Sequence, residues 1–401
     1  METILLVGNF RASVTAVRSL GRAGFRVLVA VSDEPSFAEY SRYCHSYVLE
    51  PDMETPESFV AGVTELLEAH PEVTRLFPVD QERVMLTARC RDRLPSRLRP
   101  VIADPATIEI CLDKARSFAL AETLSIPVER YARANDLQSL SFAAIGLGFP
   151  CIVRPMGSGP KLFPSGKKAV ILPRRENLAH EFHEWPEGHE ELLVQRYAPG
   201  VRHGVYFAAR EGRILGRVEV TTGRTDCRDG TGYAVEGVSV PPNPDLQGFA
   251  DRLVDALAYT GVGCLQFLRR EDGSFHFLEL NPRLGGNGAI AVRCGLDMPL
   301  LACDLAAGLR DSEPTHAWTY PPGVRYAWTF GDIRALREAG KDGEISFSQA
   351  CRWSAQIVAS ALRADVHLVW SLSDPLPALG TYAYWAPFGV GRWVFRHRKR
   401  T

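Results

Sequence analysis

One stretch of the chain, residues 264–286, constrains the fold more than any other. It reads CLQFLRREDGSFHFLELNPRLGG and places Asp272 and Gly273 between two apolar runs. Asp-Gly between apolar runs is the strongest short-range signal for a two-residue loop that joins antiparallel strands. Such a loop pairs Glu271 with Ser274 and thereby fixes the register of both strands. The stretch therefore predicts a β-hairpin whose cross-strand neighbours can be counted.

The predicted register brings polar side chains to one face of the hairpin. Counting back from the loop sets Gln266 opposite Glu279 and Cys264 opposite Asn281, and opposed residues have β-carbons roughly 5 Å apart. Gln266, Glu279 and Asn281 would then present oxygen atoms to one point, as Mg²⁺ requires when phosphate and water complete its octahedron. The alternative is a solvent-facing polar strand. It is weakened because these residues interrupt apolar strands and because an arginine and two glycines follow in residues 282–286.

Basic residues near a glycine-rich stretch form a second candidate site. Lys114 follows Asp113 at the start of a predicted helix, Arg154 ends the predicted strand CIVRP, and residues 157–168 read GSGPKLFPSGKK. Backbone N–H groups and cations are what a polyphosphate requires. The alternative is a solvated hairpin tip, since no Walker A string occurs. A third segment, residues 191–200 (ELLVQRYAPG), by itself indicates only a strand that enters a turn.

The remaining sequence indicates several packed units. Residues 1–112 alternate apolar runs with helical periodicity, as in a doubly wound domain, although residues 8–13 lack the second and third glycines of a dinucleotide fingerprint. Residues 113–310 have an α+β texture. Six of the seven tryptophans lie beyond residue 311, where we expect a separate appendage. The expected fold class is therefore α/β and α+β, with several domains.

Composition excludes several classes of protein. The 46 Lys and Arg residues balance 47 Asp and Glu residues, so the chain lacks the basic field of nucleic-acid binders and we expect no nucleic-acid partner. No segment approaches the ~20 apolar residues that cross a bilayer. The start, METILLVGNF, shows no export signal, so we expect a cytoplasmic protein. Nine scattered cysteines, none spaced C-x-x-C, indicate neither a disulfide framework nor a zinc site.

Together and in this order the motifs resemble the ATP-grasp superfamily, especially the synthetase units of carbamoyl-phosphate synthase. The resemblance covers residues 1 to about 310. It rests on DK at 113–114, GFPCIVRPMGSG at 148–159, LLVQRYAPG at 192–200, the strand with Gln266, and FLELNPR at 277–283.

The resemblance implies a particular division of the chain. A Rossmann-like N-terminal domain, the pre-ATP-grasp domain, would be followed by a two-lobed ATP-grasp domain and the appendage. The expected boundaries are 1–112 for the N-terminal domain, 113–192 for the small lobe with its glycine-rich lid, 193–310 for the large lobe with the Mg²⁺ and ATP site, and 311–401 for the appendage.

The resemblance also implies roles for individual residues. The loop of residues 156–166 would close over the ATP phosphates, and the backbone near Gln195 would meet the adenine. The implied catalytic residues are Arg283, Lys114 and Arg154. The implied nucleotide-binding residues are Lys114, Arg154, Gly157, Ser158, Gly159, Gln195, Arg196 and Tyr197. The implied metal ligands are Gln266, Glu279 and Asn281.

The activity implied is that of an ATP-dependent carboxylate-amine ligase. A carboxylate would attack the γ-phosphate of ATP, and an amine or another nucleophile would displace phosphate from the acyl phosphate. Mg²⁺ would be the metal, with Mn²⁺ as a substitute. The alternative is a catalytically weak, ATP-binding regulator, because Arg154, Arg196 and Gln266 depart from the usual lysine, acidic hinge residue and acidic ligand. A complete carbamoyl-phosphate reaction is disfavoured, since one ATP-grasp unit is present without an amidotransferase portion.

The expected partners are a small-molecule carboxylate and an amine, and a homodimer is compatible with the sequence. Arg217, Arg224 and Arg228 could bind an anionic substrate, or could equally be solvated loop arginines. Residues 376–400 combine aromatic and basic side chains. They allow a weak peripheral membrane or protein contact through this tail, although packing of the aromatics on the core is favoured.

Overall fold

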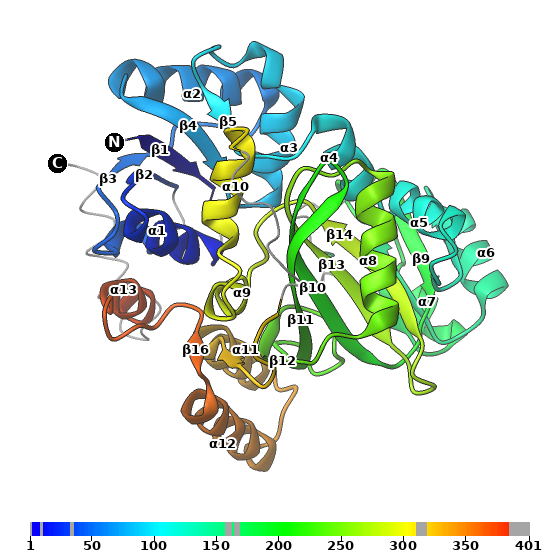
Figure 1. Cartoon of the computed structure of the whole chain (residues 1–401). Coiled ribbons are helices and arrows are strands. Elements are labelled where there is room, and N and C mark those ends of the chain that lie inside the picture. The colour runs from blue at the N-terminus through cyan, green and yellow to red at the C-terminus, as the bar shows by residue number, and fades with distance from the viewer. Residues whose placement is uncertain are drawn as a thin grey trace.

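The structure is a computed structural model of the chain, and it describes residues 2–8, 11–32, 36–156, 163, 169–309 and 319–384. Its described elements form three sheets with helices packed around them (Figure 1). The mixed α/β class predicted from the sequence is confirmed.

The N-terminal region is built around a parallel sheet of order β3-β2-β1-β4-β5. Alternate residues of the central strand enter different cores: Ile4 and Leu6 pack with α1, whereas Leu5 and Val7 pack with α2. Helices therefore cover both faces, as the doubly wound pattern predicts. The strands are β1 (Thr3–Val7), β2 (Arg26–Val31), β3 (Ser46–Leu49), β4 (Val73–Pro78) and β5 (Arg99–Pro100). The helices are α1 (Ala12–Arg22), α2 (Pro56–Ala69), α3 (Gln81–Arg89) and α4 (Pro105–Leu112), with 3₁₀ turns η1 (Ala38–Tyr40) and η2 (Arg91–Arg93).

A four-stranded antiparallel sheet of order β6-β9-β7-β8 comes next. Its strands are β6 (Tyr131–Ala134), β7 (Cys151–Pro155), β8 (Val170–Leu172) and β9 (Leu192–Arg196), and helices α6 (Leu137–Leu147) and α7 (Arg175–Glu181) belong to the same unit. Helix α5 (Lys114–Thr123) packs instead against β14 of the largest sheet. The expected boundary between residues 192 and 193 falls inside β9 and would separate most of this strand from β7, with which it pairs. The expected domain boundaries stay predictions.

The largest sheet has seven strands in the order β14-β13-β10-β11-β12-β15-β16. They are β10 (Val201–Arg210), β11 (Arg213–Thr225), β12 (Ala234–Ser239), β13 (Gly261–Arg269), β14 (Phe275–Asn281), β15 (Arg325–Ala327) and β16 (Val366–His367). Helix α8 (Pro244–Ala256) packs on the face of Phe207, while α9 (Ala289–Arg293) and α10 (Met298–Ala306) pack on the face of Tyr206. Because α1 also packs against α10, the N-terminal unit lies beside the Tyr206 face.

Residues 319–384 differ from the separate appendage expected from the sequence. Strand β15 pairs with β12 and so extends the seven-stranded sheet. The buried carboxylate of Asp374 accepts hydrogen bonds from Arg18 Nε (2.8 Å), Ser41 Oγ (2.7 Å) and the Arg42 amide (2.9 Å) of the N-terminal region. The segment is integral because it completes a sheet edge and neutralises a buried arginine.

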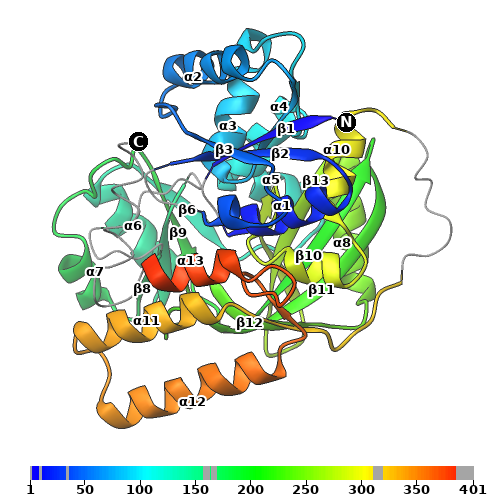
Figure 2. The same cartoon turned by 90° about the vertical axis from the view of Figure 1, so that its left-hand side faces the viewer.

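Three helices complete this segment: α11 (Thr329–Lys341), α12 (Phe347–Arg363) and α13 (Leu376–Tyr384). Figure 2 shows them side by side along one edge of the molecule, with α13 nearest the N-terminal unit. The basic end of the tail, residues 385–401, lies outside the described residues. Among the helices that are described, none is both long and apolar enough to cross a membrane.

Candidate active site

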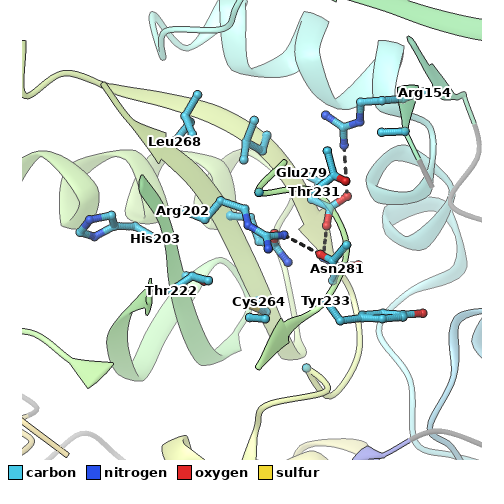
Figure 3. A pocket seen from close by; sticks show the side chains of 18 of the residues that line it. Arg154, Arg202, His203, Thr222, Thr231, Tyr233, Cys264, Leu268, Glu279 and Asn281 are labelled. Atoms are coloured by element: carbon cyan, nitrogen blue, oxygen red, sulfur yellow. Dashed lines mark hydrogen bonds and ion pairs between the residues drawn. The ribbon is translucent and has the colours of Figure 1, made fainter. Parts of the chain in front are cut away.

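A cavity of about 390 Å³ lies on the Tyr206 face of the seven-stranded sheet. Side chains from the four-stranded sheet, the hairpin β13–β14 and the N-terminal unit all line it, as Figure 3 shows in part. Of the predicted site residues that the structure describes, all line this cavity: Lys114, Arg154, Gln195, Arg196, Tyr197, Gln266, Glu279, Asn281 and Arg283. Gly157, Ser158 and Gly159 lie outside the described residues, as does most of the predicted lid.

The hairpin β13–β14 has the predicted pairs at the site but not at its loop. Arg269 opposes Phe275, and the Arg270 amide donates to the Ser274 carbonyl at 2.9 Å, so the loop is residues 271–273 rather than Asp272 and Gly273 alone. The predicted two-residue loop was therefore wrong by one residue.

A β-bulge restores the predicted register further along the strands. Phe267 opposes Phe277, whereas the next residue, Gln266, opposes Glu279, so Leu278 is the extra residue of the bulge. As a result Cys264 opposes Asn281, as counted from the sequence. The bulge offsets the longer loop, and the oxygen-bearing side chains of Gln266, Glu279 and Asn281 share the cavity.

Glu279 is the centre of a compact polar cluster. Asn281 Nδ2 donates to Glu279 Oε1 at 2.9 Å, and the guanidinium of Arg154 forms an ion pair with Glu279 Oε2 at 3.7 Å (Figure 3). Arg283 Nη2 donates to Asn281 Oδ1 at 3.4 Å. Two side chains of the expected ligand set are thus already in contact and held by cations.

The charge of Glu279 is stabilised by its surroundings. Burial acts to raise the pKa of this carboxyl, but the charges of Arg154, Lys114 and Arg283 and the hydrogen bond from Asn281 outweigh it, so the pKa lies below its usual value. Glu279 is therefore an anion at neutral pH. A carboxylate with two amide oxygens fits Mg²⁺, which accepts carboxylate and amide ligands and keeps waters. Among the described residues no group of three His, Cys, Asp or Glu side chains could hold a metal ion.

Lys114 and Arg154 are positioned by different local structures. Asp113 caps α5 by accepting the Arg116 amide at 3.0 Å, so Lys114 becomes the first helical residue, and its Nζ donates to the Met156 carbonyl at 3.3 Å. Arg154 is the penultimate residue of strand β7, and burial lowers the pKa of its guanidinium. Both cations act on Glu279 from regular secondary structure, Lys114 from the first turn of α5 and Arg154 from β7.

Gln195 and Tyr197, to which the resemblance assigns nucleotide binding, line the same cavity. Gln195 is buried. Its Oε1 accepts a hydrogen bond from Arg154 Nη1 at 3.4 Å, and its Nε2 donates to the Glu129 carbonyl at 3.5 Å. Arg196, the next residue, is exposed. Glu129 also lines the cavity and was missed by sequence reasoning. Its carboxylate is paired with Arg270 (3.3 Å) and with His276 (3.1 Å), partners too distant in the chain to be recognised as a motif.

The far end of the cavity was also missed. It includes Tyr206, Tyr326 and Asn287 together with Arg11 and Arg202. Arg202 and Tyr206 are in phase with Gly204, which opposes Gln266, so the alternation of β10 could have placed them on the site face once that pairing was known. No sequence signal connects Arg11, Asn287 or Tyr326 to this face.

The three arginines suggested as anion binders lie elsewhere. Arg217 forms an ion pair with Asp251 at 2.9 Å, Arg224 with Asp332 at 2.6 Å, and Arg228 Nη1 donates to the Glu344 carbonyl at 2.9 Å. None of the three lines the cavity. The structure therefore gives no support to the anion-binding alternative for these three arginines, each of which has a partner within the described residues.

Comparison with known proteins gives one family model and several distant relatives. The model described as ATP-grasp in the biosynthetic pathway with Ter operon matches residues 189–329. The D-alanine--D-alanine ligase of Pseudomonas fluorescens (strain Pf0-1) is 23% identical over 220 residues, which cover 51% of this chain and 65% of that protein. The formate-dependent phosphoribosylglycinamide formyltransferase of Bacteroides thetaiotaomicron is 22% identical over 317 residues, covering 73% of each.

Solved structures agree with the family model. The biotin carboxylase domain of the 2-oxoglutarate carboxylase of Hydrogenobacter thermophilus, in complex with MgADP, ADP and bicarbonate, superimposes with a TM-score of 0.62 at 15% identity. The match covers 80% of this chain and 72% of that one. The chain spans less than two thirds of the length of the first curated relatives it matches, 8% of one and 65% of the next. These likenesses establish the fold that the sequence resembled.

Proposed function

We infer that this chain, as a member of the ATP-grasp superfamily, activates a carboxylate with ATP and joins the acyl phosphate to an amine or another nucleophile, releasing ADP and phosphate. The placement in the carbamoyl-phosphate-synthase-like branch stays a prediction. The acid, the nucleophile, the use of Mn²⁺ and a dimeric state are likewise predictions.

One observation carries the proposal: three cations and one carboxylate converge at a single point of the cavity. Arg154 contacts Glu279 directly, Arg283 contacts its neighbour Asn281, and the charge of Lys114 also acts on Glu279. Phosphoryl transfer asks a protein mainly for positioning and charge neutralisation, and this group supplies both. Bound between Gln266, Glu279 and Asn281, Mg²⁺ would neutralise and orient polyphosphate oxygens.

The chain's own residues divide the remaining work. Lys114 and Arg154 would bind phosphate oxygens from the side of the small sheet, and Gln195 with the backbone to Tyr197 would orient the base. Arg283 would hold the transferred phosphate or the carboxylate that receives it. The carboxylate of the substrate is then the nucleophile, so no side chain of the protein needs to be one.

Cys264 lines the cavity but is not needed as a nucleophile. It is the only cysteine among the described lining residues, and burial raises the pKa of its thiol to about 12. Since the thiolate is the reactive form, Cys264 is unreactive at neutral pH. It contributes packing beside Asn281 rather than covalent catalysis.

The test is acid-dependent ADP release by the full chain with ATP, Mg²⁺ and pooled carboxylic acids. Hydroxylamine is added in a parallel reaction, because an acyl phosphate reacts with it to form a hydroxamate that mass spectrometry detects. ADP and hydroxamate that both depend on one acid are the expected result. ATP binding with no ADP across broad acid and amine panels contradicts the ligase and supports the regulator.

A further inference from the structure

The cavity continues past Glu279 into a second compartment that the proposed function leaves unassigned. We call it the tyrosine–arginine end and define it by Tyr206, Tyr326, Asn287, Arg11 and Arg202, all of which line the cavity. These residues come from β10, β15, the loop before α9 and the start of α1. Its chemistry therefore arises from the packing of the N-terminal unit and the C-terminal segment on the large sheet.

Arg11 brings a positive charge into this end from the N-terminal unit. Its guanidinium lies 4.2 Å from the ring centroid of Trp328 and 5.0 Å from that of Tyr233, and Nη1 donates to the Ala234 carbonyl at 3.2 Å. Two aromatic faces and a carbonyl hold this guanidinium in one position. A fixed cation that lines the cavity favours an anion nearby.

Arg202 marks the border between the two ends. Its Nη1 donates to the Gly232 carbonyl at 3.0 Å, whereas the buried Nη2 has no hydrogen-bond partner among the described residues. After burial, the charge of Arg202 is among the causes that lower the pKa of Arg154, and it also acts on Tyr326. Arg202 therefore lies within electrostatic range of both Arg154 and Tyr326.

The tyrosines add further hydrogen-bond donors. Tyr326 Oη accepts Asn287 Nδ2 at 2.8 Å, which leaves its own proton to donate. Tyr206 packs so closely on the loop after Arg283 that a β-carbon at Gly285 would lie 2.6 Å from its Cε1. Burial raises the pKa of both phenols, so both stay protonated at neutral pH. The compartment thus combines guanidinium and phenol donors.

The cavity lining has few acidic residues, and those present already form hydrogen bonds or ion pairs with neighbouring residues. The lining therefore favours an anionic over a cationic ligand. Six Lys and Arg residues line the cavity against three Asp and Glu residues. Glu279 belongs to the metal cluster, Glu129 is paired with Arg270, and Asp229 accepts the backbone amide of Thr231 at 2.9 Å. An ammonium group would meet the positive charges of Arg11 and Arg202. A ligand rich in anionic oxygen satisfies the donors instead.

We propose that the tyrosine–arginine end binds the acid substrate, and that this acid is a dianion with a second anionic group beyond the carboxylate that is activated. The proposal rests on the proposed function, because it identifies the ligand of this end with the acid that ATP activates. The reacting carboxylate lies next to Arg283, near Glu279. The second anionic group lies deeper, toward the buried Nη2 of Arg202, the guanidinium of Arg11 and the two tyrosines.

Matched acids test this assignment. Succinate and glutarate carry a second carboxylate, 3-phosphonopropionate carries a phosphonate, and butyrate and valerate have a methyl group at that position. Titration calorimetry of the full chain with Mg²⁺ and a non-hydrolysable ATP analogue measures the binding of each acid. We expect at least one dianion to bind about 10-fold or more tightly than its monoanionic partner. Comparing the carboxylates with the phosphonate identifies the second group.

Arg202→Gln assigns the preference to this end of the cavity. It should reduce the dianion preference about 10-fold and leave the affinity for the ATP analogue within about 2-fold, since Arg202 lies beyond the nucleotide cations. Arg217→Gln is the matched control, because Arg217 pairs with Asp251 outside the cavity, and it should preserve the preference. Equal binding of monoanions and dianions, no binding of any dianion, or an unchanged preference in Arg202→Gln overturns the proposal.

ADP release measured with the same acids distinguishes a failure of the substrate assignment from a failure of the proposed ligase activity. Turnover without a dianion preference retains the ligase and removes the substrate class. A dianion preference without ADP or hydroxamate formation retains the binding assignment and removes the ligase.

Discussion

The two ends of the cavity carry similar charges but are assembled in opposite ways. The end proposed to bind metal and phosphate takes Glu279, Asn281 and Arg283 from five consecutive positions, and adds Lys114 and Arg154 from two short motifs. The tyrosine–arginine end takes five residues from four separate parts of the chain, two of them from β10. Local geometry fixes the first end, whereas packing of whole elements fixes the second.

The two ends should respond differently to mutation. Within the first end a carboxylate compensates several cations, so loss of that one charge leaves the cations repelling one another. In the second end the residues come from four separate parts of the chain, so its geometry depends on how the N-terminal unit and the C-terminal segment are joined. Mutations should therefore separate the two ends.

The largest effect is expected from Glu279→Gln. The change removes the single anionic side chain of the metal cluster, and acid-dependent ADP release should fall about 100-fold or more because several kcal/mol of charge stabilisation are lost. Steady-state assays check the rate, and circular dichroism checks the fold. Gln266→Glu is the matched change on the opposite strand and should be tolerated or should tighten Mg²⁺ binding. Near-normal turnover of folded Glu279→Gln would remove the metal assignment.

The next prediction tests the join between the N-terminal unit and the C-terminal segment, which Asp374 makes through its bonds to Arg18, Ser41 and Arg42. The geometry of the tyrosine–arginine end depends on this join. Asp374→Asn leaves Arg18 buried without a counter-charge, so the free energy of unfolding in urea should fall by about 3 kcal/mol. Acid affinity should weaken more than ATP affinity, since Arg11 and Tyr326 lie on the two joined parts. Asp365→Asn, an exposed acid of the same segment that accepts the Arg325 amide, should cost no more than about 1 kcal/mol. Equal losses in the two variants contradict the join.

A third prediction contrasts Glu279 with Glu219, a buried carboxylate of β11 that has no cation cluster around it. Burial raises the pKa of Glu219 from 4.5 to about 7, although the Asn243 amide donates to it at 2.9 Å. Between these values the folded state binds the extra proton, so stability should decline as the pH rises from about 5 to 8.

The variant Glu219→Gln isolates this effect. Relative to wild type it should gain about 2 kcal/mol between pH 5 and pH 8, as measured by urea unfolding at each pH, while ADP release at pH 7 is retained. Parallel stability profiles of the two proteins would show that Glu219 does not titrate in this window. Loss of turnover would mean that the catalytic end extends to β11.

The smallest effect concerns one phenol. Tyr326→Phe removes the acceptor for Asn287 and a donor to the acid, so KM for the acid should rise about 10-fold with ATP affinity unchanged. Tyr259→Phe is the control, because Tyr259 is fully buried outside the cavity and its hydroxyl donates to the Val262 carbonyl at 2.8 Å. That control should lower stability without moving KM. The assignment of Tyr326 fails if both variants give the same KM.

Several features of the site could be predicted because they depend on neighbours in the sequence. The strand pair at residues 264–281, the facing of Gln266 and Glu279, and the capped helix that begins at Lys114 all follow from local hydrogen-bond geometry and side-chain alternation. Even so, the register was reached through a loop that is one residue too short, and the bulge at Leu278 offsets that error. Nothing in the sequence marks this bulge.

The sequence by itself determined the pairing of Gln266 with Glu279 and the doubly wound start of the chain, whereas the metal and phosphate roles assigned to these residues stay predictions. Only the tertiary structure decided that Arg11, Arg202 and Tyr326 share one compartment, that Arg217 does not belong to it, and that residues 319–384 extend the large sheet. The physical reason is that a periodic pattern specifies which face of an element is buried but not which other element covers it. That choice depends on the complementary packing of apolar faces and on buried partners such as Arg18 and Asp374, which are 356 residues apart in the chain.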